Sequence, residues 1–273
     1  MSVPSSGTDP RSAPEVQDAG MPLFRGVGVA LVTLFREDGA LDAPATAELA
    51  GRLVDLGVRC VLVAGTTGEA AALTPDERDS VVSAVRSALP ADVPVLAGTG
   101  APTGRQAAEL TERAFAVGAD AVLALSPPGV ADPRPYYETV AKAAGGPLLA
   151  YHFPGAAAPG IPVDLLAELP VSGLKDSSGD AGRLLHERDV FDGDLYTGAT
   201  SLVGLCGAVG GAGALVAVAN LAPEDAVGAF AGDAEAQVRL AAADRTASAD
   251  FPAGYKRAAA QRFGTSVLTR VGR

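Results

Sequence analysis

Lys175 stands in a sequence context that is unusual for a lysine. The chain contains three lysines and 18 arginines, and Lys142 and Lys256 occur in polar, helix-like stretches where we expect a solvated ammonium group. Lys175 instead lies within an apolar run typical of a buried strand. A desolvated lysine can lose its proton and attack a carbonyl carbon to form a Schiff base, which a guanidinium cannot do. Lys175 is therefore a candidate nucleophile, although its position alone also fits an ion pair with Asp176 or a neighbouring acid.

A tyrosine and two threonines that follow other apolar runs could assist such a lysine. Tyr151 closes the preceding run, and a phenol there can relay the protons that imine formation and aldol cleavage require. Thr66 and Thr67 are flanked by glycines and can present hydroxyl and backbone N–H groups to a carboxylate. Each has a structural alternative, because a buried tyrosine usually bonds a backbone group and the threonines also fit a tight turn between a strand and a helix.

The elements that must position these residues follow a regular pattern. Short apolar runs alternate with longer amphipathic segments, which is typical of parallel strands connected by helices. Eight such units predict a single (β/α)8 TIM barrel, an α/β fold whose active site lies at the C-terminal ends of the strands. The candidate residues stand at such ends. We expect the strands to begin near Val27, Val58, Pro94, Ala121, Pro147, Ser172, Asp194 and Gly213.

The connecting segments carry helix start signals and no sign of a domain boundary. Asp42 and Thr103 precede amphipathic runs as N-caps, and Thr74 with Glu77 forms a capping box. No composition shift or proline-rich linker divides the chain. We therefore expect a disordered N-terminal tail at 1–22, a barrel at 23–222, and the eighth helix with extra C-terminal helices of the same domain at 223–273.

Charge and composition exclude several classes of protein. With 32 acidic against 21 basic residues the formal charge is -11, which argues against a nucleic-acid partner. Two cysteines and two histidines can build neither a zinc cluster nor a disulfide framework, so we expect no metal. The first twenty residues lack the apolar core of a signal peptide, and no run approaches the roughly 18 to 20 apolar residues of a spanning helix. These features predict a cytoplasmic protein that acts on a small molecule, with no membrane partner.

One glycine-rich segment has to be compared with a dinucleotide-binding fingerprint. In GTGAPTG at 98–104 the third glycine comes one position late. Asp120, the acid that could bind a ribose, stands before the following strand and not at its end. We therefore expect no nicotinamide cofactor, and no cofactor of any kind.

Seven segments also occur in an order that is familiar from known enzymes. They are ALVTLF (30–35), GTTGEAAALTPDER (65–78), PVLAGTG (94–100), AFAVGADAVLALSPP (114–128), YHFPG (151–155), GLKDSSGD (173–180) and VAVANLAP (216–223). Together they resemble the dihydrodipicolinate synthase and N-acetylneuraminate lyase family of class I aldolases. The resemblance implies a barrel that binds pyruvate or another 2-oxo acid as an imine of Lys175, with Tyr151 as the proton-transferring phenol. It further implies that Thr66 and Thr67 hold the substrate carboxylate and link the proton relay, which makes Thr66 a catalytic residue as well. The family pattern also implies a homo-oligomer, a dimer or a tetramer.

Two departures from the pattern of the synthases bear on the reaction. Gly129 stands where those enzymes carry a relay tyrosine, and Ala156 stands where they carry an arginine for the second substrate. Tyr136 and Tyr137 come several residues later, on the expected following helix. We therefore expect an aldolase that cleaves a 2-keto-3-deoxy sugar acid or a 4-hydroxy-2-oxo acid.

Three more residues are candidates for substrate binding, and two alternative functions are open. Ser177 could contact the hydroxyls of such a substrate, and Gly198 and Leu215, at the seventh and eighth strands, are also expected to bind substrate. One alternative is a 4-hydroxy-tetrahydrodipicolinate synthase with an atypical relay. The other is a 2-oxo acid binding protein that has lost turnover.

Overall fold

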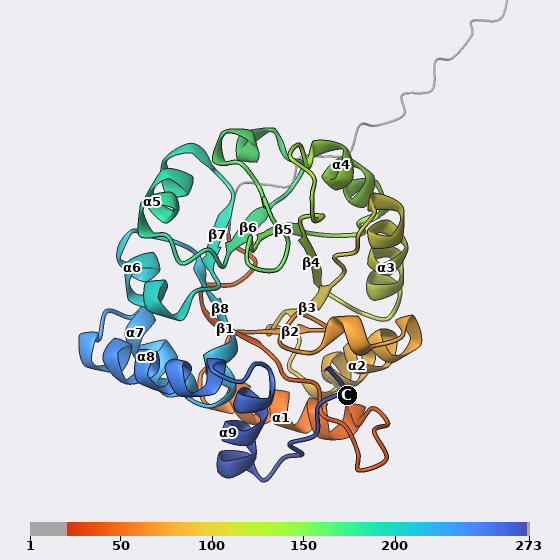
Figure 1. Cartoon of the computed structure of the whole chain (residues 1–273), viewed down its shortest axis with the longest axis vertical. Coiled ribbons are helices and arrows are strands. Elements are labelled where there is room, and N and C mark those ends of the chain that lie inside the picture. Colours follow the sequence, from red (N-terminus) through yellow and green to blue (C-terminus); the bar gives the residue numbers. More distant parts are fainter. Residues whose placement is uncertain (1–20, 272–273) are drawn as a thin grey trace, which may run out of the picture.

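The computed structural model of the chain describes residues 21–271 and contains a closed barrel of eight parallel strands (Figure 1). Each strand pairs with its neighbours in chain order, and β8 pairs with β1 to close the barrel. The predicted TIM barrel is thus confirmed, and each strand begins within two residues of its expected start. The strands are β1 (Gly26–Ala30), β2 (Cys60–Val63), β3 (Val95–Gly98), β4 (Ala121–Leu125), β5 (Leu148–His152), β6 (Gly173–Asp176), β7 (Asp194–Thr197) and β8 (Gly213–Val216).

Helices surround the barrel and begin at the predicted caps. The Asp42 and Thr103 side chains accept hydrogen bonds from the first turns of α1 and α3, and Thr74 forms the capping box with Glu77 at the start of α2. A 3-10 helix at Val163–Glu168 stands between β5 and β6, where the regular pattern would have an α-helix. The barrel helices are α1 (Ala43–Asp55), α2 (Pro75–Ala88), α3 (Gly104–Ala116), α4 (Arg134–Ala143), α5 (Ala181–Val190), α6 (Val203–Ala208) and α7 (Pro223–Phe230).

The strands separate two apolar clusters because alternate side chains point to opposite faces of a strand. The larger cluster fills the space between the barrel and its helices. A smaller cluster fills the barrel interior, as expected for a packed barrel and not a pore. Its buried members are Phe24, Ala30, Cys60, Leu62, Leu96, Ala121, Leu123, Leu149, Tyr151, Tyr196, Ala212 and Leu215.

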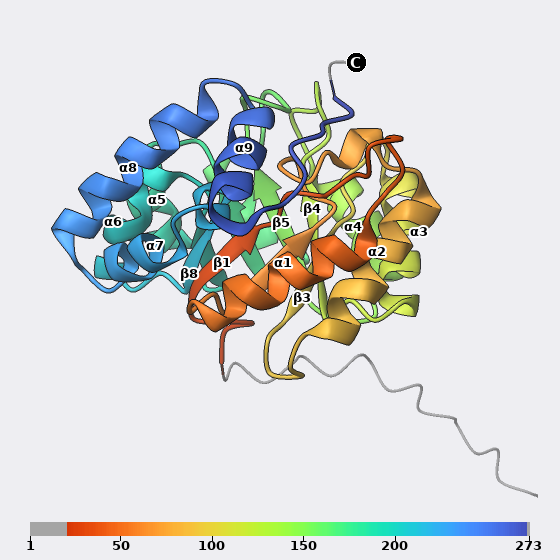
Figure 2. The same ribbon diagram turned by 90° about the horizontal axis from the view of Figure 1, so that it is seen from below.

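Two helices follow the barrel, as predicted, and the chain then returns to the barrel mouth. Helix α8 (Ala234–Ser248) packs on α7, and α9 (Ala253–Phe263) packs on α8. Figure 2 shows the segment after α9 running back past β1 to the side of the barrel where α1 and α2 lie. Among residues 21–271 no helix is long and apolar enough to cross a membrane. The expected disordered tail falls almost entirely on residues 1–20, which lie outside the described part of the chain.

Candidate active site

Lys175 projects from β6 and is buried without a carboxylate partner. In strand register it is level with Tyr151 of β5 and Tyr196 of β7. Its side chain is buried, with 4% of the residue exposed, and Nζ lies 4.3 Å from the centroid of the Tyr151 ring. Burial lowers the pKa of Lys175 from its ordinary value to about 7. A substantial fraction of the side chain is therefore the unprotonated amine near neutral pH.

Asp176, the partner considered for this lysine, is bound elsewhere. Its Oδ2 lies 2.8 Å from Nε of Arg183, which also lies 2.7 Å from Oε1 of Glu187. Burial raises the pKa of Glu187 to about 9, so this carboxyl is protonated at neutral pH. Burial also acts against ionisation of Asp176, but hydrogen bonds from Glu187 and Ser178 outweigh it and lower the pKa of Asp176. The ion pair between Lys175 and Asp176 is therefore not formed.

The Tyr151 hydroxyl faces other polar side chains of the site. It accepts a hydrogen bond from Oγ of Ser177 at 3.3 Å. Burial raises the pKa of Tyr151 to about 12, while hydrogen bonding with Ser177 and Thr66 acts in the opposite direction. Tyr151 is thus a protonated phenol at neutral pH whose ionised form has two hydrogen-bonding neighbours, which suits a group that donates and recovers a proton.

The loop that carries Thr66 and Thr67 leaves two backbone donors free. No hydrogen bond within residues 21–271 uses the backbone N–H of either threonine. The loop is closed by the bond from Glu69 N to the Thr66 carbonyl at 3.1 Å, and Thr33 Oγ1 donates to the Gly68 carbonyl at 2.7 Å. Free N–H groups beside hydroxyls are what a carboxylate requires from a nest without a fixed charge.

Gly198 and Ser177 are brought against the lysine, and Leu215 lies in the barrel interior. A Cβ at position 198 would lie 2.7 Å from Cε of Lys175 and 1.9 Å from Oγ of Ser177, so only glycine fits there. Leu215 is fully buried in the interior cluster, and its Cδ1 would lie 2.7 Å from a Cβ at Gly28. The structure thus gathers Thr66, Tyr151, Ser177 and Gly198 around Lys175, whereas Leu215 contributes to the core beside them.

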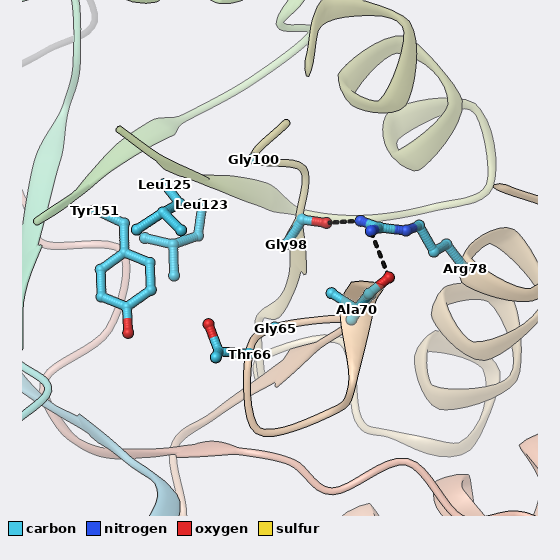
Figure 3. Close-up of a pocket in the computed structure, with 10 residues that line it drawn as sticks. Gly65, Thr66, Ala70, Arg78, Gly98, Gly100, Leu123, Leu125 and Tyr151 are labelled. Atoms are coloured by element: carbon cyan, nitrogen blue, oxygen red, sulfur yellow. Dashed lines mark hydrogen bonds between the residues drawn. The ribbon is translucent and has the colours of Figure 1, made fainter. Parts of the chain in front are cut away.

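A cavity of about 70 Å³ lies beside Thr66 and Tyr151 (Figure 3). Arg78 reaches the cavity from α2 and donates to the carbonyls of Gly98 at 3.0 Å and Ala70 at 2.6 Å. These bonds join the loop that carries Thr66 and Thr67, which we call the threonine loop, to β3. Figure 3 shows the Tyr151 ring on the opposite side of the cavity from this guanidinium. The full lining is Ala64, Gly65, Thr66, Ala70, Arg78, Gly98, Gly100, Leu123, Leu125 and Tyr151.

The two tyrosines of α4 serve the scaffold. Tyr137 is fully buried, donates from its hydroxyl to the Ala124 carbonyl at 3.0 Å and accepts from the Tyr151 backbone N–H at 3.4 Å. The Tyr136 hydroxyl accepts from the Ala101 backbone N–H at 3.3 Å. Both hydroxyls are therefore hydrogen-bonded to the backbone. The positions of the two departures, Gly129 and Ala156, are exposed.

A second lysine is buried as well, and here the sequence prediction was wrong. Lys256 was expected to be solvated, but its side chain is fully buried and paired with the equally buried Glu69. Residue type and local pattern could not reveal this, because the two residues are 187 positions apart and meet only when α9 is brought to the loop that follows β2. Glu69 itself was missed. Its one sequence signal is a charge between the glycine of GTTG and three alanines.

Within the described residues no group of three or more His, Cys, Asp or Glu side chains could hold a metal ion. The two cysteines, Cys60 and Cys206, are free and buried. Burial raises the pKa of both thiols, which makes them poor metal ligands and poor nucleophiles. The polar groups near Lys175 are a phenol, hydroxyls and backbone N–H groups, which can donate hydrogen bonds to a small anionic molecule.

Comparison with known proteins identifies the family. Residues 23–261 match the dihydrodipicolinate synthetase family. An uncharacterised DapA-like lyase of Halobacterium salinarum is 38% identical over 250 residues, which cover 88% of this chain and 82% of the relative. A 4-hydroxy-tetrahydrodipicolinate synthase of Salinibacter ruber is 36% identical over 214 residues, which cover 74% of this chain and 70% of the relative.

Solved structures agree with this assignment. YagE, a prophage protein of the dihydrodipicolinic acid synthase family from E. coli K12 solved in complex with pyruvate, superposes with a TM-score of 0.86 at 25% identity, covering 92% of this chain and 93% of that one. Dihydrodipicolinate synthase from Aquifex aeolicus gives a TM-score of 0.83 at 26% identity, with 91% of each chain covered. The chain is a metal-independent lyase of the dihydrodipicolinate synthetase family.

Proposed function

We propose that this lyase is a class I aldolase in which Lys175 forms a Schiff base with pyruvate or another 2-oxo acid. Its substrate is a 2-keto-3-deoxy sugar acid or a 4-hydroxy-2-oxo acid. The observation that carries the proposal is the state of Lys175, which is 4% exposed, lacks a carboxylate partner and has a pKa lowered to about 7. A neutral amine at physiological pH is the form that adds to a carbonyl.

Imine formation uses the groups around the lysine. The unprotonated Nζ of Lys175 adds to the C2 carbonyl carbon, and the addition product loses its hydroxyl as water. Tyr151 supplies the proton for that leaving hydroxyl, and the resulting phenolate accepts hydrogen bonds from Ser177 and Thr66. The substrate carboxylate is held by the free N–H groups of the loop at Thr66 and Thr67.

Cleavage follows from the same arrangement. The Tyr151 phenolate removes the proton of the substrate's C4 hydroxyl, the bond between C3 and C4 breaks, and its electron pair moves into the protonated imine. An aldehyde leaves and an enamine stays on Lys175. Protonation of C3 by Tyr151 and attack by water then release pyruvate and the free amine. Tyr151 alternates between acid and base, as its hydrogen-bonded position permits.

Trapping with borohydride tests the Schiff base. Pyruvate with borohydride should leave a reduced adduct on the wild type that mass spectrometry maps to Lys175. The adduct should be absent from Lys175→Ala and present in Lys142→Ala, a matched variant at an exposed lysine. An adduct of equal yield in Lys175→Ala, or none on the wild type, would overturn the proposal.

A product assay then identifies the reaction. Purified protein is given a panel of 2-keto-3-deoxy acids and 4-hydroxy-2-oxoglutarate, and pyruvate release is measured with and without a chelator. We expect release from at least one compound, unchanged by the chelator. Adduct formation without release from any compound would instead support the non-catalytic binding protein.

A second candidate function is 4-hydroxy-tetrahydrodipicolinate synthase, because several relatives carry that name. The residues at two positions argue against this function. Gly129 stands where the synthases carry the relay tyrosine, and Ala156 stands where they carry the arginine for the second substrate. The missing relay phenol removes acid-base assistance worth about 100- to 10,000-fold in rate. The missing guanidinium removes a contact of about 1.5 to 3 kcal/mol. We therefore expect a coupled assay with aspartate semialdehyde to give turnover orders of magnitude below the common enzyme median of about 10 per second.

The proposal also covers the oligomeric state and the cellular location of the enzyme. We infer a homo-oligomeric enzyme, a dimer or a tetramer, which acts in the cytoplasm. Sedimentation equilibrium of the purified chain tests the first point, and a monomer at micromolar concentration would contradict it. Fractionation of the source cells tests the second.

A further inference from the structure

The threonine loop lies between two strained backbone positions. Among residues 21–271 the non-glycine residues with positive φ are Ala64 at 50° and Glu69 at 56°, one before and one after Thr66 and Thr67. A left-handed conformation costs a residue with a side chain roughly 1 to 2 kcal/mol, and surrounding contacts have to impose it. The shape of this loop therefore depends on what holds its two ends.

The C-terminal end of the loop is held by the last described residues of the chain. Glu69 is fully buried, and its Oε1 pairs with Lys256 of α9. Its Oε2 accepts hydrogen bonds from the backbone N–H groups of Arg270 at 2.7 Å and Val271 at 2.8 Å. Lys256 Nζ in turn donates to the Leu268 carbonyl at 2.7 Å. We call residues 268–271 the C-terminal strap.

The Arg270 side chain fixes the strap to the neighbouring segments. Its guanidinium donates to the Ala72 carbonyl at 3.0 Å and to both oxygens of Glu77 at 2.8 and 2.6 Å. This contact lowers the pKa of Glu77 to about 2. The guanidinium also lies 4.3 Å from the centroid of the buried Phe35 ring, over which Lys256 lies at the same distance. Figure 2 shows the end of the chain beyond α9 on the side of the barrel where α1 and α2 lie.

We propose that the C-terminal strap positions the threonine loop for the substrate carboxylate, with Glu69 as the positioning residue through which it acts. The inference rests on the proposed function, since it assigns the carboxylate of the 2-oxo acid to Thr66 and Thr67. Arg270 and the buried pair of Glu69 and Lys256 keep Glu69 in its left-handed conformation. That conformation keeps the two free N–H groups of the loop directed at the site. Lys175 lies on β6 and Tyr151 on β5, and no hydrogen bond or ion pair within residues 21–271 joins either side chain to the strap.

This arrangement predicts a specific split in the kinetics of imine formation. Arg270→Ala removes the side-chain bonds that fix the strap to Ala72 and Glu77, so the loop is held less firmly. The pyruvate concentration that half-saturates borohydride trapping should then rise about 10-fold, equivalent to a charge-assisted hydrogen bond at the low end of its range. The trapping rate at saturating pyruvate should stay within about 3-fold, because the nucleophile is unchanged. Arg270→Lys, which keeps the charge, should recover part of the affinity.

The matched control is Arg257→Ala. Arg257 lies on α9 and pairs with Asp250 at 2.7 Å through a side chain that is 53% exposed, so its loss removes a C-terminal arginine without touching the strap. Hydrogen exchange gives a second readout: residues 65–72 should exchange faster in Arg270→Ala than in Arg257→Ala, and pyruvate should slow that exchange in the wild type. Both assays are run well below the Tm of each variant.

The outcomes separate the two proposals. An unchanged half-saturating concentration in Arg270→Ala, or a slower maximal rate at unchanged half-saturation, would overturn the positioning role of the strap while leaving the Schiff base intact. Absence of any adduct on the wild type would overturn the proposed function and this inference together. Glu69→Gln should repeat the Arg270→Ala result. If it does not fold, Arg270→Ala decides alone.

Discussion

Lys175 and Lys256 are both buried in this protein, but they differ in their polar partners. Lys256 has a buried carboxylate partner in Glu69, a backbone carbonyl acceptor in Leu268 and the Phe35 ring beneath it. Lys175 has an aromatic ring as well, Tyr151, but no carboxylate. A fully paired ammonium remains charged and serves the structure, whereas an unpaired one yields its proton and becomes a nucleophile.

Because Lys256 is buried but paired, burial of a lysine does not by itself indicate catalysis. Burial lowers the pKa of both lysines, and at Lys256 Glu69 acts in the opposite direction. The two lysines differ because Asp176 pairs with Arg183, which leaves the Lys175 amine without a counter-ion.

Removing the unpaired lysine should have the largest effect on activity. In Lys175→Met no covalent intermediate can form, so pyruvate release should fall by at least about 1,000-fold, as when a catalytic nucleophile is lost. Lys142→Met, at an exposed lysine of α4, should stay within about 2-fold of the wild type. Turnover above one hundredth of wild type in Lys175→Met would mean that another group performs the chemistry.

Removing the paired lysine should have the largest effect on stability. Lys256→Met leaves Glu69 buried without a counter-ion, which costs about 3 to 5 kcal/mol in the free energy of unfolding. Denaturant titration of Lys256→Met beside Lys142→Met measures the difference. A loss below about 1 kcal/mol would show that this pair does not carry the structural role assigned to it.

The pH dependence should distinguish the two lysines as well. The rate of borohydride trapping at subsaturating pyruvate should rise between pH 6 and 8 with a midpoint near the lowered pKa of Lys175, about 7. The neighbouring groups do not titrate in this window, since burial lowers the pKa of His152 to about 4 and raises that of Tyr151 to about 12. A midpoint above pH 9 would place an ordinary, solvated lysine at the site.

The smallest expected effect is the change in stability when Lys175, the lysine without a counter-ion, is replaced. The pKa of Lys175 is lower in the folded protein than in the unfolded chain, so burying its charged form costs free energy of unfolding. This destabilisation is at its full size below about pH 7 and is absent above the ordinary lysine pKa of 10.5. Lys175→Met should therefore be more stable than the wild type at pH 6, by roughly 1 to 3 kcal/mol. The gain, measured as a Tm difference, should shrink as the pH rises towards 10. A variant less stable at pH 6 would contradict the unpaired state of the amine.

The amino-acid sequence alone was enough to predict the barrel and to select the residues that we propose as catalytic. Strand positions could be predicted because buried parallel strands are continuous apolar runs, and helix starts because caps such as Thr74 with Glu77 act within one turn. Lys175, Tyr151 and Thr66 could be found because each stands at the C-terminal end of such a run. These signals are local, so they are legible before the chain folds.

Only the tertiary structure decided which charges are paired. The sequence could not show that Asp176 turns to Arg183, that Tyr137 serves the backbone of β5, or that Lys256 meets Glu69. Each of these contacts depends on how elements far apart in the sequence pack together. The last contact joins residues that are 187 positions apart. Electrostatic energies change steeply with burial and with separations of a few ångströms, and those quantities exist only once the chain has folded.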